Sequence, residues 1–352
     1  MSKTFEVIIG WDIGGAHLKV AMMDVSGKII AVIQQPCPLW KGLEELGAAI
    51  DTVMESFPKK TFLHAVTMTG ELVDLFSSRE QGVTAIVDYI VGRLGHENIT
   101  LFAGSKGFIS PEQLSPDVTN DIASANWLAS ATIVAKKVKT GLFVDIGSTT
   151  TDIIVCHDVT VKMRGASDFE RLAFEEMVYT GIVRTPVMSV SQEVEFNGHR
   201  VGLMAEYFAT MADVYRLTGE LNESHDQMAA ADNGEKTEVG SGRRLARMIG
   251  CDYQDNTHEQ WLRLAKNLRS KQLARLQQAC ERQLSRGFMD SKSCFVGAGI
   301  GRFLVKELAS RLDYPYIDFE DLFKSSSFES GMSVADCAPA VAVGDLARMS
   351  LN

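Results

Sequence analysis

The sequence predicts an α/β protein made of two related lobes, with a helical insertion in the second lobe. Three observations predict this class. One pattern occurs twice, at residues 9–21 and 143–154: an apolar strand that ends in Asp, a Gly turn, and a second apolar strand. Asp12 and Asp145 are 145 minus 12, or 133, residues apart, which is the length of a domain rather than the ~20–50 residues of a solenoid repeat. In both halves, strands and helical patterns then alternate.

Length and composition agree with this class and exclude several others. At 352 residues, 45% of them hydrophobic, the chain can form two domains that each bury a core. The excess of 45 acidic over 35 basic residues gives a net charge of −10, which argues against a general nucleic-acid binder. No segment approaches the ~20 apolar residues of a membrane span, and the N-terminus has no signal-peptide pattern. We therefore expect a cytoplasmic protein with neither nucleic-acid nor membrane partners; a homo-oligomer is compatible with the sequence.

The elements of the first half follow from the period of their apolar residues. A period of two predicts strands, and apolar residues three and four apart predict helices. The turns at Gly14-Gly15 and Ser26-Gly27 separate the first three strands. The predicted strands are 4–13, 18–25, 29–34, 62–68 and 99–103, and the predicted helices are 43–57, 71–76, 83–94 and 122–137.

The second half starts again with a hairpin, at 142–156, and then adds segments that the first half lacks. Asn197-Gly198 marks the turn of a β excursion over 186–201. Residues 219–241 are polar and rich in Gly and Asp, which is typical of a loop. The remaining predicted elements are helices at 169–179, 204–217, 243–249, 258–286, 302–312 and 339–349 and a strand at 293–296. The predicted domains are 1–120, closed by the terminal helix 338–352, and 121–337, with its insertion around 185–290.

The two Asp-Gly hairpins are the strongest functional signal. A turn whose backbone N–H groups approach phosphate oxygens excludes bulky side chains, which explains the glycines, and hydroxyls can donate to the same oxygens. The predicted phosphate-binding residues of the hairpins are Gly14, Gly15, Lys19, Gly147, Ser148, Thr149 and Thr150. Carboxylates hold Mg²⁺ or its waters, so Asp12 and Asp145 are the candidate metal ligands. The alternative is a pair of ordinary hairpin turns without a ligand.

Four further features are candidates for the same site. Gly297, Gly299 and Gly301 form a turn between a strand and a helix, where backbone N–H groups can meet an anionic ligand, or where a helix simply packs close to a strand. Glu71 starts a predicted helix and is a candidate catalytic carboxylate, although capping alone would explain it. Asn126, inside a predicted helix, is a candidate ligand-binding residue. Arg184 can clamp a phosphate or form a surface ion pair.

These features together resemble the sugar kinase/Hsp70/actin superfamily, in which the two hairpins are phosphate loops and the late Gly turn is the adenosine loop. More narrowly, the chain is similar to hydantoinase/oxoprolinase-related proteins linked to tetrahydromethanopterin-dependent one-carbon transfer. The resemblance implies two actin-like (ribonuclease H-like) lobes that flank a central cleft. It is carried by the segments 10–16, 67–72, 125–127, 145–152, 179–186 and 208–214, which span nearly the whole chain.

The narrower resemblance implies an activity. Archaeal members act in methanofuran biosynthesis: they join an aminomethyl-furanmethanol diphosphate to the phenol of γ-glutamyltyramine and release diphosphate. The implied partners are therefore a small-molecule diphosphate and a phenolic amine, and the implied cofactor is Mg²⁺. Asp145, Asp152 and Glu71 are the candidate catalytic residues, and the choice of general base between Asp152 and Glu71 is open. The sequence leaves the acceptor open among tyramine, tyrosine and their glutamylated forms.

The principal alternative is an ATP-dependent small-molecule kinase or hydrolase of the same superfamily. A third class is a nucleotide-sensing scaffold like actin and Hsp70. Gly297-Ala298-Gly299 lacks the doubled Gly that is typical of the superfamily's adenosine loop. This departure argues against ATP and suits a site reused for a different diphosphate.

Overall fold

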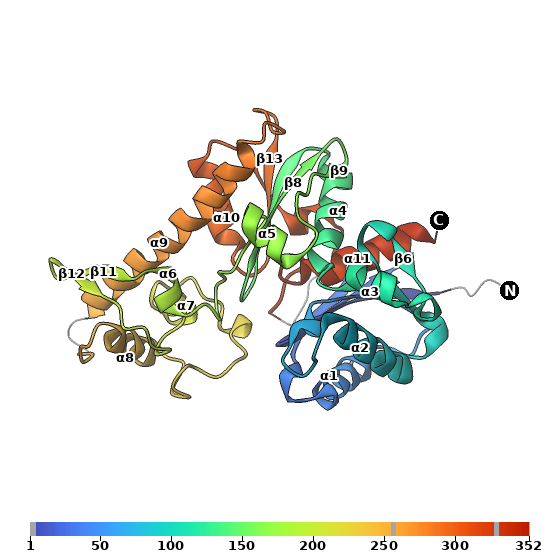
Figure 1. Cartoon of the computed structure of the whole chain (residues 1–352), viewed down its shortest axis with the longest axis horizontal. Helices are drawn as coiled ribbons and strands as arrows, with labels where there is room; N and C mark the ends of the chain where they lie inside the picture. Colours follow the sequence, from blue (N-terminus) through green and yellow to red (C-terminus); the bar gives the residue numbers. More distant parts are fainter. Residues whose placement is uncertain (1–4, 255–257, 327–330, 352) are drawn as a thin grey trace. The chain divides into compact units, whose positions relative to one another are not determined.

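The computed structural model describes residues 5–254, 258–326 and 331–351. It divides into two compact units, which are coloured along the chain in Figure 1. Unit 1 comprises Met1–Gly141, Cys156–Lys162 and Asp318–Asn352, and unit 2 comprises Leu142–Val155 and Met163–Ile317. The lobes that we predict from the sequence, 1–120 and 121–337, are defined by the repeated pattern and not by compactness. Their boundaries stay a proposal.

Unit 1 is built on a six-stranded sheet in the order β3-β2-β1-β4-β5-β6. The strands β1, β2 and β3 are antiparallel neighbours, whereas β1, β4 and β5 run parallel. The strand at the centre is buried along its whole length. The bounds are β1 Val7–Ile13, β2 His17–Asp24, β3 Ile29–Pro36, β4 Phe62–Met68, β5 Ile99–Phe102 and β6 Phe108–Ile109.

Helices cover both faces of this sheet. On one face, α1 (Leu43–Glu55) and α2 (Arg79–Leu94) bury Leu46, Ile50 and Ile86 in a core that includes Trp11. On the other face, α11 (Ala338–Ser350) packs on β1, β2 and β4 and beside α4 (Asn126–Val138). Every residue of α11 from 338 to 347 is buried, so this segment completes the core of unit 1.

Unit 2 repeats the strand order of unit 1. Its sheet runs β10-β8-β7-β13-β14, so the strand that bears Asp145 lies between a hairpin partner and a strand from far along the chain. In chain order this is 3-2-1-4-5, as in the first five strands of unit 1. The bounds are β7 Gly141–Ile146, β8 Thr151–His157, β10 Met177–Val178, β13 Cys294–Ala298 and β14 Tyr316–Asp318; the short β9, Thr160–Val161, pairs with β8. The α/β class with two ribonuclease H-like lobes is confirmed.

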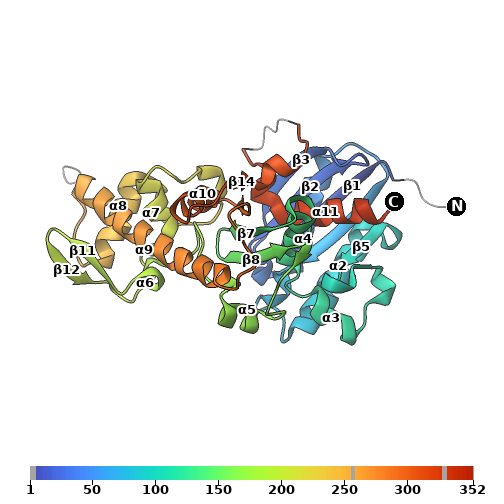
Figure 2. The same cartoon turned by 90° about the horizontal axis from the view of Figure 1, so that it is seen from above.

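The insertion of unit 2 gathers around its longest helix, α9 (His258–Leu284). Figure 2 shows α7, α8 and the β11–β12 hairpin grouped at one part of α9, and all of them contact it. Asn197 and Gly198 have φ of 49° and 79° in the predicted hairpin turn, as a type I′ turn requires. The bounds are α5 Asp168–Phe174, α6 Val187–Val190, β11 Glu193–Phe196, β12 His199–Gly202, α7 Met211–Leu217, α8 Glu238–Met248 and α10 Arg302–Arg311.

Six predicted helices are wrong in extent. Those predicted over 83–94 and 243–249 begin too late, since α2 starts at Arg79 and α8 at Glu238, within the predicted loop 219–241. The segment 122–137 contains the end of α3 (Pro116–Ile122) and most of α4, because Ser124 has φ of 52° and breaks the helix. Residues 71–76 contribute only to a 3₁₀ turn, Gly70–Leu72. The helix predicted over 169–179 ends at Phe174 because Glu175 is left-handed (φ 56°). The helix predicted from residue 204 begins only at Met211, after the cap Thr210. Thr4, the first residue of a predicted strand, lies outside the described residues.

Two further features bear on function class. Within the described residues, no helix combines the length and the apolarity that crossing a bilayer requires. All six cysteines are free thiols, and five of them are buried.

Candidate active site

In unit 1, the first Asp-Gly hairpin ends the central strand with a row of polar side chains. Asp12 pairs with Lys19 on β2 and with Thr67 on β4, and Lys19 pairs with Gln34 on β3. Directly paired residues project from the same face of a sheet. Asp12 is only 5% exposed. The row therefore places one carboxylate and one ammonium side by side at the end of β1.

The glycines of this hairpin are required by close packing. The Gly14 N–H donates to the carbonyl of His17 (3.0 Å), and a Cβ on Gly14 would lie 2.8 Å from that same oxygen. A Cβ on Gly15 would lie 2.8 Å from Val73 Cγ1. Neither glycine has a positive φ. What the turn needs is space beside its backbone rather than a left-handed conformation.

Glu71 and Asn126 lie at the same hairpin. The Thr69 N–H donates to the Ile13 carbonyl (2.9 Å), which attaches the segment before Glu71 to the end of β1. Asn126 Nδ2 donates to Asp12 Oδ1 (3.3 Å).

The turn before α4 holds the second carboxylate. Ser124 Oγ donates to Glu71 Oε1 (2.8 Å), and Glu71 is 1% exposed. Because Ser124 and Asn126 are two residues apart, one short turn contacts both Asp12 and Glu71. The break in the predicted helix is thus what presents these polar side chains to the hairpin.

In unit 2, the second hairpin is held by its own backbone and by the loop around Arg184. The Gly147 N–H donates to the Thr150 carbonyl (2.9 Å). The Ser148 carbonyl accepts from the N–H groups of Val183 (3.1 Å) and Arg184 (2.8 Å). Arg184 Nη1 also donates to Thr149 Oγ1 (3.4 Å), so this exposed guanidinium lies at the predicted phosphate turn.

The late Gly turn lies directly against the same hairpin. The Gly301 N–H donates to the Ile146 carbonyl (2.9 Å). Gly299 has φ of 77°, and a Cβ there would lie 2.3 Å from Asp145 Oδ1. A Cβ on Gly297 would lie 2.6 Å from Tyr316 Cε2. The structure therefore brings the two Gly-rich turns of unit 2 into direct backbone contact next to Asp145.

Asp152 occupies a different environment from the turn. It lies in β8, and Arg171 Nη2 donates to its Oδ1 (2.6 Å). Arg171 is 2% exposed and also donates to the Glu176 carbonyl. Burial raises the pKa of the Asp152 carboxyl, and the Arg171 guanidinium acts in the opposite direction. This ion pair links β8 to α5.

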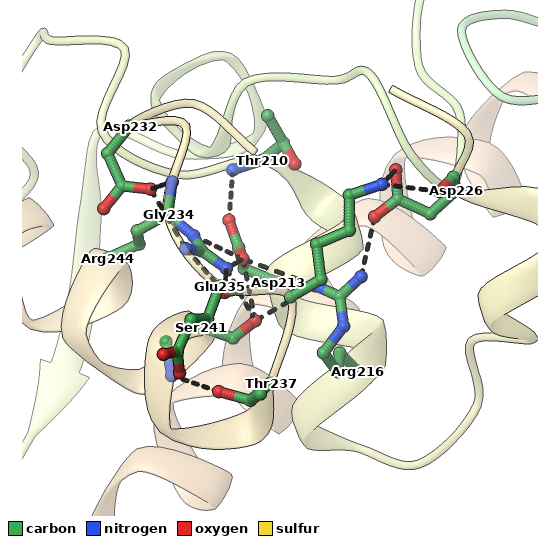
Figure 3. Close-up of polar contacts among 12 residues, drawn as sticks. Thr210, Asp213, Arg216, Asp226, Asp232, Gly234, Glu235, Thr237, Ser241 and Arg244 are labelled. Carbon is green, nitrogen blue, oxygen red and sulfur yellow. Dashed lines mark hydrogen bonds and ion pairs between the residues drawn. The ribbon is translucent and has the colours of Figure 1, made fainter. Parts of the chain in front are cut away.

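Sequence reasoning missed a network of buried charged side chains, which Figure 3 draws around Asp213. Asp213 Oδ1 accepts from Arg244 Nε and from Ser241 Oγ (2.8 Å each), and its Oδ2 accepts from the Thr210 N–H (3.0 Å). Arg216 Nη2 donates to Asp226 Oδ2 (2.6 Å). The available signal was Thr210-x-x-Asp213, a capping box that marks the true start of α7.

This network fixes the segment that carries Arg184. The Met211 N–H donates to the Thr185 carbonyl (2.8 Å), and the Ala212 N–H donates to the Val183 carbonyl (3.4 Å). Burying a charge is costly unless it is paired, so each of these side chains is held by its partners. The network therefore acts as a rigid support. It lines a small cavity together with Arg184 and Tyr207.

The predicted site residues thus fall into two groups. One is in unit 1: Asp12, Gly14, Gly15, Lys19, Glu71 and Asn126. The other is in unit 2: Asp145, Gly147, Ser148, Thr149, Thr150, Arg184, Gly297, Gly299 and Gly301, with Asp152 set apart by its pairing to Arg171. That Asp12 and Asp145 face one another stays a prediction. Across the described part of the chain, no cluster of three or more His, Cys, Asp or Glu forms a metal site by itself.

Two units of one topology, each with an Asp-Gly hairpin after its central strand, define a duplicated ribonuclease H-like protein. Comparison with known proteins assigns the family. The chain belongs to the hydantoinase/oxoprolinase family, whose profile matches residues 63–341.

Two archaeal relatives carry the same name, (4-{4-[2-(γ-L-glutamylamino)ethyl]phenoxymethyl}furan-2-yl)methanamine synthase. The protein of Methanocaldococcus jannaschii is 27% identical over 347 residues, which cover 98% of this chain and 99% of that protein. The protein of Methanococcus vannielii is 28% identical over 127 residues, which cover 36% of this chain and 57% of that protein. Among solved structures, nucleotide-free acetone carboxylase is similar in fold, with a TM-score of 0.57 and 9% identity over 88% of this chain and 68% of that one.

Proposed function

We propose that the protein is a transferase of methanofuran-type cofactor biosynthesis. It joins an aminomethyl-furanmethanol diphosphate to the phenol of γ-glutamyltyramine or a related tyrosine derivative and releases diphosphate. The observation that carries this proposal is the end-to-end match to the M. jannaschii synthase, whose name describes an aryl ether of an aminomethyl furan. The Asp-Gly hairpins support it, because their backbone N–H groups and hydroxyls have the donor chemistry that an anionic leaving group needs.

The reaction balances without a nucleotide. The bond between the furan's methylene carbon and the diphosphate oxygen breaks, and a bond between that carbon and the phenol oxygen forms. The bonding electrons leave with diphosphate, and the phenol proton goes to a base. Because furan stabilises positive charge on the methylene carbon, the main demand on the protein is to stabilise the negative charge that develops on diphosphate.

The unit 2 hairpin is the proposed site for the diphosphate. Its hydroxyls at Ser148, Thr149 and Thr150 and its backbone N–H groups can donate to phosphate oxygens. Arg184 already contacts Thr149, so its guanidinium is placed to pair with the same anion. Lys19, in the row beside Asp12, is the proposed cation of the unit 1 hairpin.

The two hairpin aspartates have the donor chemistry that Mg²⁺ requires. Both offer carboxylate oxygens next to turns proposed to hold phosphate, and Asn126 orients the carboxylate of Asp12 through Oδ1. Asp12 and Asp145 would hold the ion directly or through its waters. When bound, Mg²⁺ would neutralise charge on the leaving diphosphate.

Of the two candidate bases, Glu71 is favoured. It lies at the unit 1 hairpin, and Ser124 holds one of its oxygens. Asp152 is instead engaged by the buried Arg171, whose Nη2 donates to its Oδ1 (2.6 Å). Glu71 is therefore the residue proposed to take the phenol proton.

The direct experiment incubates the pure protein with Mg²⁺, the furanmethyl diphosphate and either tyramine or γ-glutamyltyramine, without ATP. We expect an aryl ether by mass spectrometry and one diphosphate released per ether. If ether formation requires ATP, or if a small molecule is phosphorylated and no ether forms, the protein is instead an ATP-dependent kinase or hydrolase.

Two carboxamide variants test the base in the same assay. Glu71→Gln should lower kcat by about two orders of magnitude or more, which is a typical contribution of a general base. Asp152→Asn removes the charge that pairs with Arg171, and its effect should appear mainly as lower thermal stability. The opposite pattern, with kcat lost only in Asp152→Asn, would assign the base to Asp152.

A further inference from the structure

Unit 1 contains a cavity of about 470 Å³ that the proposed reaction does not use. It lies where β4 begins, between the ends of α1 and α2, and its wall includes Lys60, Phe62, His64 and Arg93. On β1 the register partner of His64 is Ile9, three residues before Asp12. The cavity is therefore separate from the hairpin at the far end of β1.

His64 gives this cavity a polar side chain whose two ring nitrogens can be told apart. The side chain is 3% exposed, and its Nδ1 accepts a hydrogen bond from Trp11 Nε1 (3.1 Å). The indole N–H can only donate, so the proton of the neutral imidazole must be on Nε2. No residue in the described part of the chain accepts from Nε2. Nε2 is not a fully enclosed atom, and His64 lines the cavity, so an oxygen of a ligand there can accept from it.

The charges on the cavity wall leave one cation in excess. Arg93 is paired with Asp51, to whose carboxylate its guanidinium donates. Lys60 is exposed and forms no ion pair with any residue that the structure describes. Asp51, Lys60 and Arg93 are the wall residues that carry a formal charge when His64 is neutral, so the net charge of the wall is positive.

The rest of the wall is largely apolar. Ile50, Met54, Phe62 and Leu94 line it, and small-molecule sites commonly combine such a wall with a few polar groups. We propose that this cavity binds a small organic carboxylate with an apolar body. A carboxylate oxygen accepts from His64 Nε2–H, Lys60 supplies the opposite charge, and the apolar body covers Ile50, Met54 and Leu94.

Titration with benzoate tests the proposal on the intact protein labelled with ¹⁵N-histidine. His64 Nε2 is followed by long-range ¹H–¹⁵N NMR, and the affinity is measured by calorimetry. We expect a saturable shift of the Nε2–H signal. Acetate, which lacks the apolar body, and inorganic phosphate should bind more weakly.

Lys60 and Lys59 provide a matched pair of variants, since they are exposed neighbours and only Lys60 lines the cavity. Lys60→Glu should weaken benzoate binding about tenfold or more, in line with the loss of a charge-assisted contact, whereas Lys59→Glu should leave it nearly unchanged. Equal losses in both variants, or benzoate binding that leaves the His64 signal in place, would overturn the assignment. So would phosphate binding as tightly as benzoate.

Discussion

Asp145 and its neighbour Ile146 are the residues of the second hairpin that the late Gly turn contacts. Asp145 is the last residue but one of β7, precedes the Gly147 turn, and lies so close to Gly299 that a side chain on residue 299 would clash with it. The backbone around it is thereby fixed before any ligand arrives. Preorganised groups of this kind lower a barrier because they need no rearrangement as charge develops.

We therefore expect Asp145→Ala to lower turnover at least about a hundredfold while leaving the fold intact. Asp145 is half-buried near the end of β7, so the loss of its carboxylate removes little core packing. The measurement is ether formation together with thermal unfolding. Asp88→Ala, an exposed position on α2, is the matched control and should keep full activity. A well-folded Asp145→Ala protein with normal turnover would contradict the metal role.

A second residue, His64, makes stability depend on pH. Burial lowers the pKa of His64 to about 4, from 6.5 in an unfolded chain. Between these values the unfolded chain takes up a proton and the folded protein does not. Stability therefore falls with falling pH, by roughly 3 kcal/mol across the window from pH 6.5 to 4.

Urea unfolding at several pH values measures this slope, and His64→Gln is the comparison. The Gln side chain can still accept a hydrogen bond from Trp11 but does not titrate. The wild-type protein should lose more stability than the variant between pH 6.5 and 4. Parallel curves for the two proteins would show that His64 is protonated without cost.

At the scale of elements, the contact of α11 with β1 depends on a missing side chain. A Cβ on Gly10 would lie 1.9 Å from the Ala340 carbonyl oxygen and 2.9 Å from the Gly344 N. Helix and strand backbones are therefore in direct contact next to Asp12. This contact sets the depth at which α11 lies over the central strand.

Gly10→Ala should destabilise the protein by about 1–3 kcal/mol or more, because strand or helix must move to admit the methyl group. Gly92→Ala is the control: it lies inside α2 with nothing within 4 Å and without a positive φ. That substitution should be neutral or stabilising by up to about 1 kcal/mol, since Ala favours a helix. Equal effects of the two changes in a denaturant titration would refute the packing argument.

Sequence patterns located the elements that carry strong periodicity. The strand at 62–68 agrees in both bounds, and the hairpin at 142–156 and the helix at 258–286 agree within a residue or two. The short strands β6, β9, β10 and β14 were not predicted, because two or three residues cannot show a period. The helix break at Ser124 was missed because its left-handed φ has no signal in the surrounding Ala-rich sequence.

The sequence predicted the site residues that belong to the repeated hairpin pattern. It could not predict the contacts that those residues make with other segments. Asp12, Asp145 and their glycines follow from the duplication. The contacts of Asn126 with Asp12 and of Ser124 with Glu71 join residues 114 and 53 positions apart, which no local pattern reveals. The Asp213 network was missed for the same reason: its acids and bases come together only after α7 and α8 have packed.

At the scale of the whole molecule, the chain passes between the units at four points, after Gly141, Val155, Lys162 and Ile317. Unit 1 consequently needs the segment that begins at Asp318. A chain that ends at Cys337 lacks α11 and leaves uncovered the face of the sheet that carries Gly10 and Met23.

We expect this truncation to abolish the folding of unit 1. Hydrogen exchange should show lost protection in β1, β2 and β4, and the protein should aggregate through the exposed apolar face. Removal of only the two residues after Ser350 is the control and should leave protection in these strands unchanged. Normal protection of β1 without α11 would show that the helix is dispensable.

The late position of α11 in the chain has a consequence for synthesis. Domains of most multidomain proteins fold in the order in which the ribosome delivers them. Here the unit whose strands are translated first cannot close its core until residues 338–350 have emerged, which is after unit 2 has been delivered in full. The nascent chain must therefore carry a first sheet without its α11 cover through most of its synthesis. A chaperone that shields β1 during that interval would act on the part of the polypeptide that was made first.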